Sequence, residues 1–277
     1  MIKLLKKVIK YLPAGLQKWI VERYWLSQVK AHYHFRFNGF DRAELKQFER
    51  YVNMHLPSGD KQAALMKASV DEYIALKPLL NQLFPGVKPP IKIMDYGCGL
   101  GRSSIFMRQM FKWQEAIFYL VDGHGECTAG LRPSQRGYHV DVAGLVDSFY
   151  TDFKLIRKFL LANDLSNFVM IDLAGGKEAL NRIKDLDLFY SFHSLGYHYD
   201  ISAMFELYGL NELVRPGGVY IFGIRRQGDP LRRSLGYEDL LSKYGLELIA
   251  EVAGAWMQDF VLLCKKGQSV GWEAGRQ

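Results

Sequence analysis

Short apolar runs alternate with amphipathic segments between residues 91 and 266, and this alternation constrains the fold more than any other feature of the sequence. Seven of the runs have the length and composition of β-strands. They are IKIMDY (91–96), AIFYLVD (116–122), NFVMIDL (167–173), LDLFYSFH (186–193), GGVYIFGI (217–224), LELIAEV (246–252) and FVLLCKK (260–266). The first five are apolar almost throughout, which is typical of parallel strands covered on both faces. The pattern therefore predicts a doubly wound, Rossmann-like α/β sheet.

Three of the intervening segments have helical periodicity: residues 104–113, 147–163 and 203–214. One part of the strand assignment has a rival, because the apolar stretch YHVDVAG (138–144) competes with NFVMIDL (167–173) for the place of the third strand. We prefer 167–173, because the predicted helix over 147–163 comes directly before it.

Residues 1–84 are predicted to form a helical N-terminal region, and residues 85–277 the main domain. The longest helical pattern of this region covers 64–84, and Pro78 is expected to kink or end it. The aromatic side chains of the region belong either to the core or to a lid over the substrate. A stretch rich in proline and glycine follows and marks the boundary.

The net charge of +7 is confined to the start of the chain. Residues 1–36 contain eight Lys or Arg and a single acid, Glu22, whereas the rest of the chain has 28 basic and 28 acidic residues. A neutral body argues against a nucleic-acid-binding surface on the main domain. Residues 1–12 form a basic amphipathic pattern, which suits an anionic membrane surface, the domain itself or a second subunit of a homodimer.

The cysteines indicate a reducing compartment. Cys98, Cys127 and Cys264 are odd in number, far apart and in no CxxC pair, so neither a disulfide framework nor a structural zinc site is expected. No apolar run reaches the roughly 18 residues expected of a membrane span. We expect a cytoplasmic protein, with contact at the inner face of the membrane as a further option.

A glycine-rich loop, DYGCGLGR, follows the first predicted strand and precedes the first helix of the main domain. In α/β folds this is the position where ligands bind. The spacing G-x-G-x-G differs from the G-x-G-x-x-G of a dinucleotide site, and the GK[ST] of a P-loop is absent. Asp95 stands ahead of the loop and Asp122 ends the second strand. These two acids suit an adenosine that carries a cationic amino-acid tail, which describes S-adenosylmethionine (SAM) better than a phosphate ligand.

The segment KIMDYGCGLGR resembles motif I of the class I SAM-dependent methyltransferases, and LVRPGGVYIFGIR (213–225) resembles the segment that enters their fifth strand. The resemblance covers roughly residues 85–266. It implies a seven-stranded sheet in which the last strand is antiparallel and lies beside the fifth. It also implies SAM as the cofactor.

The same resemblance assigns residues to parts of the cofactor. It implies that Asp122 holds the ribose and that Asp172 meets the adenine amino group. The residues that would border the methionine part are Asp95, Gly97, Gly99 and Gly101.

The loop after the fourth strand is predicted to hold the catalytic residues. In this family the loop lies beside the transferable methyl group, and a hydroxyl acceptor is helped by a base that titrates near neutrality. His198 is the first candidate and His193 the second; the alternative is that they cap the strand or fill the core. Tyr197 and Tyr199 would contact the substrate. No compact set of metal ligands is present, so no metal is expected.

The acceptor is predicted to be a hydroxyl of a sugar, a nucleotide-sugar or a lipid-linked glycan. The Asn-Pro-Pro-Tyr pattern of amide and base methylation is absent, which argues against a DNA substrate. The segments around the fourth and fifth strands resemble bacterial methyltransferases of surface polysaccharides. Arg225 and Arg226 could bind a phosphate, or lie in a solvated loop. Two other functions remain open: an RNA methyltransferase, and a non-catalytic scaffold or regulator that binds the cofactor.

Overall fold

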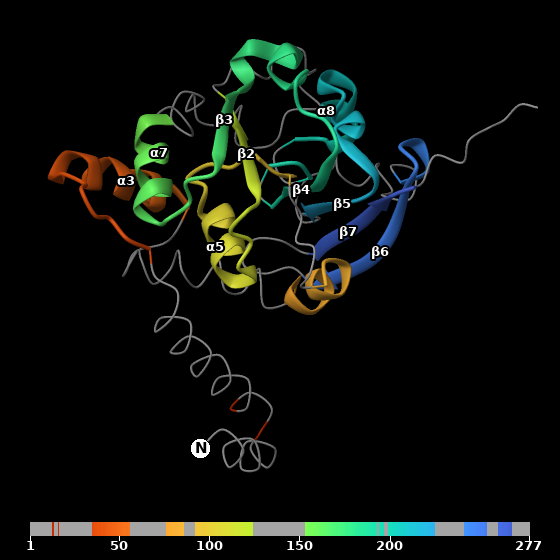
Figure 1. Ribbon diagram of the computed structural model, residues 1–277, viewed down its shortest axis with the longest axis horizontal. Coiled ribbons are helices and arrows are strands. Elements are labelled where there is room, and N and C mark those ends of the chain that lie inside the picture. Colours follow the sequence, from red (N-terminus) through yellow and green to blue (C-terminus); the bar gives the residue numbers. More distant parts are fainter. Residues whose placement is uncertain are drawn as a thin grey trace, which may run out of the picture.

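A computed structural model of the chain describes residues 13, 16, 35–55, 76–85, 92–123, 153–192, 194–196, 199–224, 241–253 and 260–267 (Figure 1). The elements along the chain are α3 (Arg42–His55), β1 (Lys92–Tyr96), α5 (Arg102–Phe111), β2 (Ile117–Asp122), α7 (Phe153–Ala162), β3 (Phe168–Asp172), the 3-10 segment η4 (Leu173–Leu180), β4 (Leu186–Ser191), α8 (Ile201–Tyr208), the 3-10 turn η5 (Leu210–Glu212), β5 (Val214–Ile224), β6 (Leu246–Ala253) and β7 (Phe260–Lys266).

The strands form one seven-stranded sheet in the order β3-β2-β1-β4-β5-β7-β6. The pairs β3–β2, β2–β1, β1–β4 and β4–β5 are parallel, whereas β7 is antiparallel to both of its neighbours, β5 and β6. The Rossmann-like sheet and its antiparallel last strand beside the fifth are thus confirmed. The pairing of β3 with β2 also confirms 167–173 as the third strand; the rival 138–144 lies outside the described residues.

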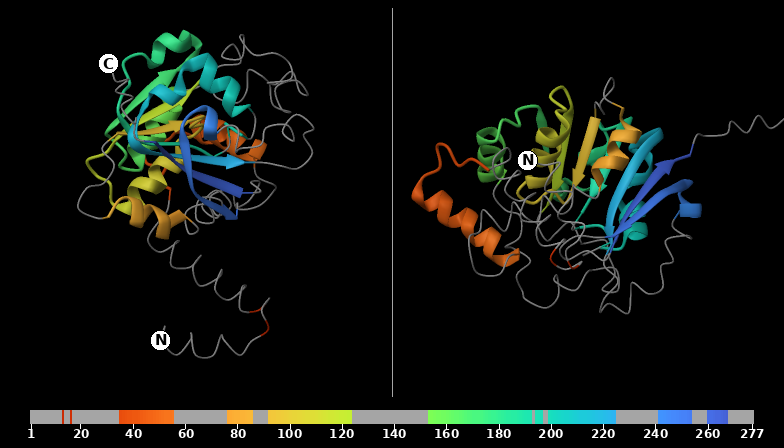
Figure 2. Two further views of the ribbon diagram at one scale, coloured as in Figure 1. Left: turned by 90° about the vertical axis from the view of Figure 1, so that its right-hand side faces the viewer. Right: turned by 90° about the horizontal axis from the view of Figure 1, so that it is seen from below.

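Helices cover both faces of the sheet (Figures 1 and 2). On one face α5 and α7 pack on the odd-numbered residues of β1, which include Ile93. On the other face η4 and α8 pack on Met94 and Tyr96. Successive side chains of a strand point to opposite faces, so two separate apolar clusters result. The strand order reverses between β1 and β4, and this switch point is where open α/β sheets bind ligands.

The N-terminal part that the structure describes is anchored on α7. Asp41 begins α3 with a reciprocal cap: its Oδ1 accepts the N–H groups of Ala43 and Glu44, and Glu44 Oε2 accepts the N–H of Asp41. The buried Asn163 donates its Nδ2 to the carbonyl of Arg36 and accepts the N–H of Arg36, at 3.0 and 2.8 Å. The two hydrogen bonds between Asn163 and Arg36 therefore fix the segment before α3 to the end of α7, although these segments are far apart in the sequence.

Phenylalanines complete this anchor. The ring of Phe159 on α7 lies 4.7 to 5.5 Å from the rings of Phe35, Phe37 and Phe48. Phe35 and Phe48 are buried in the same cluster as α5 and α7. For these aromatic residues, the structure supports a place in the core.

Two predicted boundaries are wrong: the end of the helix over 203–214 and the start of the fifth strand. The helix predicted over 203–214 ends at Tyr208, because Gly209 adopts a left-handed conformation that caps it. The fifth strand begins at Val214, three residues earlier than predicted, with an irregularity in its pairing between Val214 and Val219. Pro216 has no N–H and Gly217 has a φ of 77°, so the ladder with β4 is interrupted there.

Pro78 does not end its helix, because residues 76–83 are helical around it. No helix among the described residues has the length and the apolar character needed to cross a membrane. The predicted basic helix of residues 1–12 lies outside the part of the chain that the structure describes.

Candidate functional site

The glycine loop is a tight turn at the carboxyl end of β1. Gly97, Gly99 and Gly101 have φ angles of 72°, 51° and 69°, in the left-handed region that favours glycine. The N–H groups of Gly97 and Cys98 both donate to the carbonyl of Val121 on β2, at 2.8 and 3.0 Å. The turn is therefore tied to the neighbouring strand before the chain enters α5.

Two of the glycines are also required by close packing inside the protein. A Cβ on Gly97 would lie 2.2 Å from Cβ of Ser194, in the loop after β4. A Cβ on Gly101 would lie 2.6 Å from Cδ2 of Leu160 on α7. The absence of a side chain at these positions lets two other elements close on the loop.

Asp122 is the central polar group of the site. Its Oδ2 accepts the N–H of Gly99 at 2.7 Å and its Oδ1 accepts the N–H of Gly123 at 2.8 Å, and the residue is 5% exposed. Burial raises the pKa of this carboxyl to about 7, although the two N–H groups oppose the shift. The negative charges of Asp95 and Asp172 raise it further. Asp122 thus links the end of β2 to the glycine loop.

Three aspartates end or nearly end three adjacent strands. Asp172 is paired in register with Asp122 across β3 and β2, and Asp95 belongs to the penultimate position of β1. The negative charges of Asp95 and Asp172 both act on Asp122 and raise the pKa of its carboxyl group. The predicted cofactor residues Asp95, Gly97, Gly99, Asp122 and Asp172 are thus brought together at one edge of the sheet.

Asp95 lies below the loop, on the face of the sheet that α5 covers. It is 3% exposed, and its Oδ2 accepts the hydroxyl of Ser104 at 2.8 Å. The Ser104 hydroxyl is also 2.7 Å from the hydroxyl of Tyr190 on β4. A chain of polar groups therefore runs through the core beneath the glycine loop.

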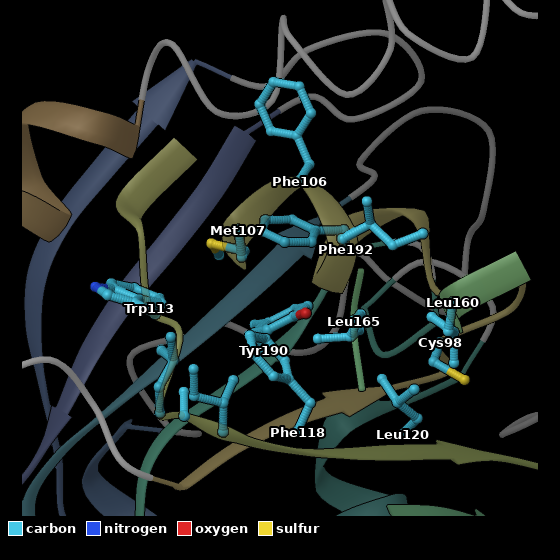
Figure 3. Close-up of a cluster of buried hydrophobic side chains, with 14 of the residues drawn as sticks. Cys98, Phe106, Met107, Trp113, Phe118, Leu120, Leu160, Leu165, Tyr190 and Phe192 are labelled. Atoms are coloured by element: carbon cyan, nitrogen blue, oxygen red, sulfur yellow. The ribbon is translucent and has the colours of Figure 1, made fainter. Parts of the chain in front are cut away.

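Cys98 packs between the glycines as a small apolar residue. It is 6% exposed, and its Sγ lies 3.9 Å from Oδ2 of Asp122. Burial, followed by the charges of Asp122 and Asp95, raises the pKa of its thiol. Figure 3 shows its side chain beside Leu160. The thiol is therefore held neutral near the acids.

The loop after β4 lies against the glycine loop. Ser194 is buried and packs on Gly97, as described above. The N–H of Leu195 donates to the hydroxyl of Ser191 at 2.9 Å, and the N–H of Tyr199 donates to the carbonyl of Ser194 at 3.1 Å. Asp200 caps α8, because its Oδ1 accepts the N–H of Ala203 at 2.8 Å. The loop therefore turns back on itself before α8 begins.

Several predicted site residues cannot be placed. His193, Tyr197, His198, Arg225 and Arg226 lie outside the described residues. Tyr199 is described and half-buried, and it packs against the cluster that α8 covers. Among the described residues, no group of three or more His, Cys, Asp or Glu is placed to hold a metal ion.

Sequence reasoning missed Ser104 and Ser194, and it assigned no role to Tyr190. Tyr190 was visible only as one aromatic residue in an apolar run, and Ser104 as the third residue of a helix. One signal was available: Asp95 and Tyr190 carry polar groups inside strands that are buried on both faces, and a buried polar group needs a partner inside the core.

No known family pattern matches the sequence, and no curated protein matches it in sequence. Fibrillarin from Aeropyrum pernix, in complex with SAM, is a similar solved structure; it is 13% identical, with 71% of this chain and 76% of that chain covered and a TM-score of 0.44. The magnesium protoporphyrin IX methyltransferase ChlM from Synechocystis PCC 6803, with bound SAM, is 14% identical, with 83% and 100% covered and a TM-score of 0.46. The chain spans 64% of the length of a protein from Pyrococcus horikoshii, to which it is 14% identical over 73% of its own length, with a TM-score of 0.42.

Proposed function

We propose that this protein is a SAM-dependent methyltransferase that acts on a hydroxyl group of a sugar or glycan precursor. The observation that carries the cofactor assignment is the Asp122 carboxylate, which is bonded to the N–H of Gly99 next to the switch point of the sheet. A buried carboxylate at a strand end is suited to accept hydroxyl groups of a ligand at that end of the sheet.

The charge of the site supports SAM over a phosphate ligand. The negative charges of Asp95 and Asp172 both raise the pKa of Asp122, and burial already makes its ionised form costly. An anionic ligand would add to that cost. A ligand with ribose hydroxyls and a cationic tail would instead donate hydrogen bonds to Asp122 and offset the charge of all three acids.

When bound, SAM supplies an electrophilic methyl group on a sulfonium. The protein then needs to align an acceptor oxygen with that methyl group and to take up the proton of the acceptor. We assign this base to His198, with His193 as the second candidate. Each directly adjoins a described residue, Tyr199 or Ser194. The N–H of Tyr199 donates to the carbonyl of Ser194, and Ser194 packs on Gly97 of the glycine turn.

For the acceptor, Tyr197 and Tyr199 would contact the sugar ring, and Arg225 and Arg226 would bind a phosphate of a nucleotide-sugar or a lipid-linked glycan. A guanidinium group binds phosphate with two parallel hydrogen bonds, so the pair suits a diphosphate linkage. The support for this part is the sequence resemblance around the fourth and fifth strands.

The cofactor assignment is tested by titration calorimetry with SAM. We expect the wild-type protein to bind and the Asp122→Ala variant to lose at least about tenfold in affinity, because hydrogen bonds to a charged group are worth roughly 1.5 to 3 kcal/mol. Asp187→Ala is the matched control, because this aspartate lies at the other end of the sheet. Equal binding by wild type and Asp122→Ala would show that the site is elsewhere.

The acceptor is tested by incubation with labelled SAM and a panel of nucleotide-sugars, with RNA as the competing substrate. Transfer of label to a nucleotide-sugar, lost in His198→Ala with SAM binding intact, is the expected result. Transfer to RNA alone would replace the sugar assignment, and binding of SAM without transfer to any acceptor would favour a regulatory protein.

A further inference from the structure

Three buried polar groups connect two strands directly beneath the switch point. Asp95 on β1 and Tyr190 on β4 are partners in the parallel register, and these are the two strands at which the strand order reverses. Ser104, in the first turn of α5, lies above both. In open α/β sheets the ligand crevice forms outside the strand ends at this point. The group is therefore placed under the proposed cofactor rather than in a remote part of the core.

The hydrogen bonds of this group have a defined direction. The Ser104 hydroxyl donates to Oδ2 of Asp95 at 2.8 Å. A serine hydroxyl has one proton, so its second contact, 2.7 Å from the hydroxyl of Tyr190, has Tyr190 as the donor. The exposed fractions are 3% for Asp95 and 0% for the other two side chains. The direction thus runs from Tyr190 through Ser104 to the carboxylate.

The apolar surroundings of these two hydroxyl groups make their burial unfavourable for the stability of the core. Figure 3 shows Tyr190 among apolar side chains, which include Phe118 and Phe192. The rings of Tyr190 and Phe192 are 5.2 Å apart. Hydroxyls and a carboxylate buried in such a cluster need hydrogen bonds merely to offset their desolvation, and apolar residues of similar shape would do as well or better for stability. The hydrogen bonds that run from Tyr190 through Ser104 to Asp95 are explained if the orientation of the Asp95 carboxylate matters for function.

We propose that Ser104 and Tyr190 are positioning residues that hold the Asp95 carboxylate in one orientation beneath the switch point, where its charge selects a ligand with a cationic tail. This inference rests on the proposed function. Neither hydroxyl touches the cofactor; each acts through Asp95. The tail of SAM carries a sulfonium and an ammonium group, and a fixed negative charge in a low-dielectric region attracts them more strongly than a mobile one in water would.

The test compares two ligands that share the adenosine but differ in the tail. Titration calorimetry measures the affinity for SAM and for 5′-methylthioadenosine, which lacks both cationic groups. We expect Ser104→Ala to weaken SAM about tenfold, the effect of one hydrogen bond to a charged group, and to change the affinity for 5′-methylthioadenosine less than about twofold. Tyr190→Phe should act in the same direction by a smaller factor.

Two neighbours serve as controls. Ser103 is a buried serine of the same helix turn with no hydrogen bond from its hydroxyl to any described residue, so Ser103→Ala should leave the ratio of the two affinities unchanged. Tyr220→Phe removes a buried hydroxyl that bonds the carbonyls of Leu210 and Asn211, away from Asp95, and should also leave the ratio unchanged. The ratio, unlike stability, is not moved by a general loss of packing.

The variant that combines Ser104→Ala with Tyr190→Phe provides a second measurement. Because Tyr190 acts through Ser104, the double variant should bind SAM no more weakly than Ser104→Ala alone. If Ser104→Ala fails to fold, Tyr190→Phe, which keeps the shape of the ring, carries the same comparison. An unchanged ratio of the two affinities, whether both ligands lose affinity equally or neither does, would overturn the inference. SAM binding by the wild type would stay intact in that case. A wild type that binds neither ligand would overturn the proposed function itself.

Discussion

The two ends of the central sheet both carry buried or half-buried aspartates, but their partners differ. At the amino end, Asp187 accepts the Nε–H of Arg215 at 2.7 Å and the backbone N–H of Lys92 at 2.9 Å. At the carboxyl end, Asp122 accepts two backbone N–H groups and has two other aspartates near it. The first arrangement neutralises a charge and joins strands. The second leaves negative charge in place, which suits a ligand that brings the positive charge itself.

The largest effect that separates the two ends is expected in the pH dependence of stability. The carboxyl of Asp122 has a pKa of about 7 in the folded protein against 3.8 as its ordinary value. Between these values the folded state binds more protons than the unfolded state. The contribution of Asp122 to the free energy of unfolding should therefore fall as the pH rises from about 4 to about 7, by up to about 1.4 kcal/mol per pH unit, and change no further above about pH 7.

Chemical denaturation of wild type and Asp122→Asn at pH 5 and pH 8 checks this. We expect the wild type to lose more stability between the two values than the variant does, because the variant has no proton to release. The absolute stability of the variant is not the readout, since an amide cannot accept both N–H groups. Parallel pH profiles for the two proteins would contradict the assignment.

The next effect concerns glycines with positive φ at the two ends. A Gly97→Ala change at the carboxyl end places a methyl group 2.2 Å from Cβ of Ser194 and keeps a φ of 72°. We expect a loss of roughly 3 kcal/mol in the free energy of unfolding, from backbone strain and overpacking together. At the amino end of β6, Gly245 has a φ of 62° and open space around it. Gly245→Ala should cost only about 1 kcal/mol, from strain alone.

Denaturant titrations of the two variants measure the difference. Ser194→Gly in the Gly97→Ala background should recover part of the loss, because it removes the atoms in conflict. Equal losses of unfolding free energy in Gly97→Ala and Gly245→Ala would contradict the close contact between Gly97 and the loop after β4.

The smallest effect is expected from the aspartate of the amino end. Asp187→Ala removes a half-exposed ion pair with Arg215 and leaves the N–H of Lys92 without this acceptor. We expect a loss of about 1 to 2 kcal/mol in the free energy of unfolding with SAM affinity unchanged. Thermal denaturation and calorimetry on the same sample check both halves. A matching loss of SAM affinity would remove the functional distinction between the two ends.

The strands were predictable because burial on both faces leaves a signature in the sequence. The predicted run 91–96 became β1 at Lys92–Tyr96, and 260–266 became β7 without a change. The boundaries that failed, at the end of α8 and the start of β5, depend on backbone conformations that apolar periodicity does not report. The insertion of β7 beside β5 came from the family resemblance, since periodicity alone does not specify strand order.

Part of the site was predictable for a related reason. Asp122 and Asp172 were recognised because each ends an apolar run, and the ends of adjacent parallel strands meet at one edge of the sheet. The partners of Asp95 were not predictable. Ser104 on α5 and Tyr190 on β4 are 86 residues apart, and they meet only because β4 pairs with β1 and α5 packs on the same face of the sheet. The contact between Gly97 and Ser194 is of the same kind.

The sequence by itself determined the layers of this protein, the glycine turn and the acids at its strand ends, because each of these is written in local spacing and composition. Tertiary structure alone decided what the glycines make room for, which groups raise the pKa of Asp122, and which hydroxyls hold Asp95. Those properties depend on distances between atoms of different strands and helices. Such distances arise only when the chain packs into a core whose interior excludes water.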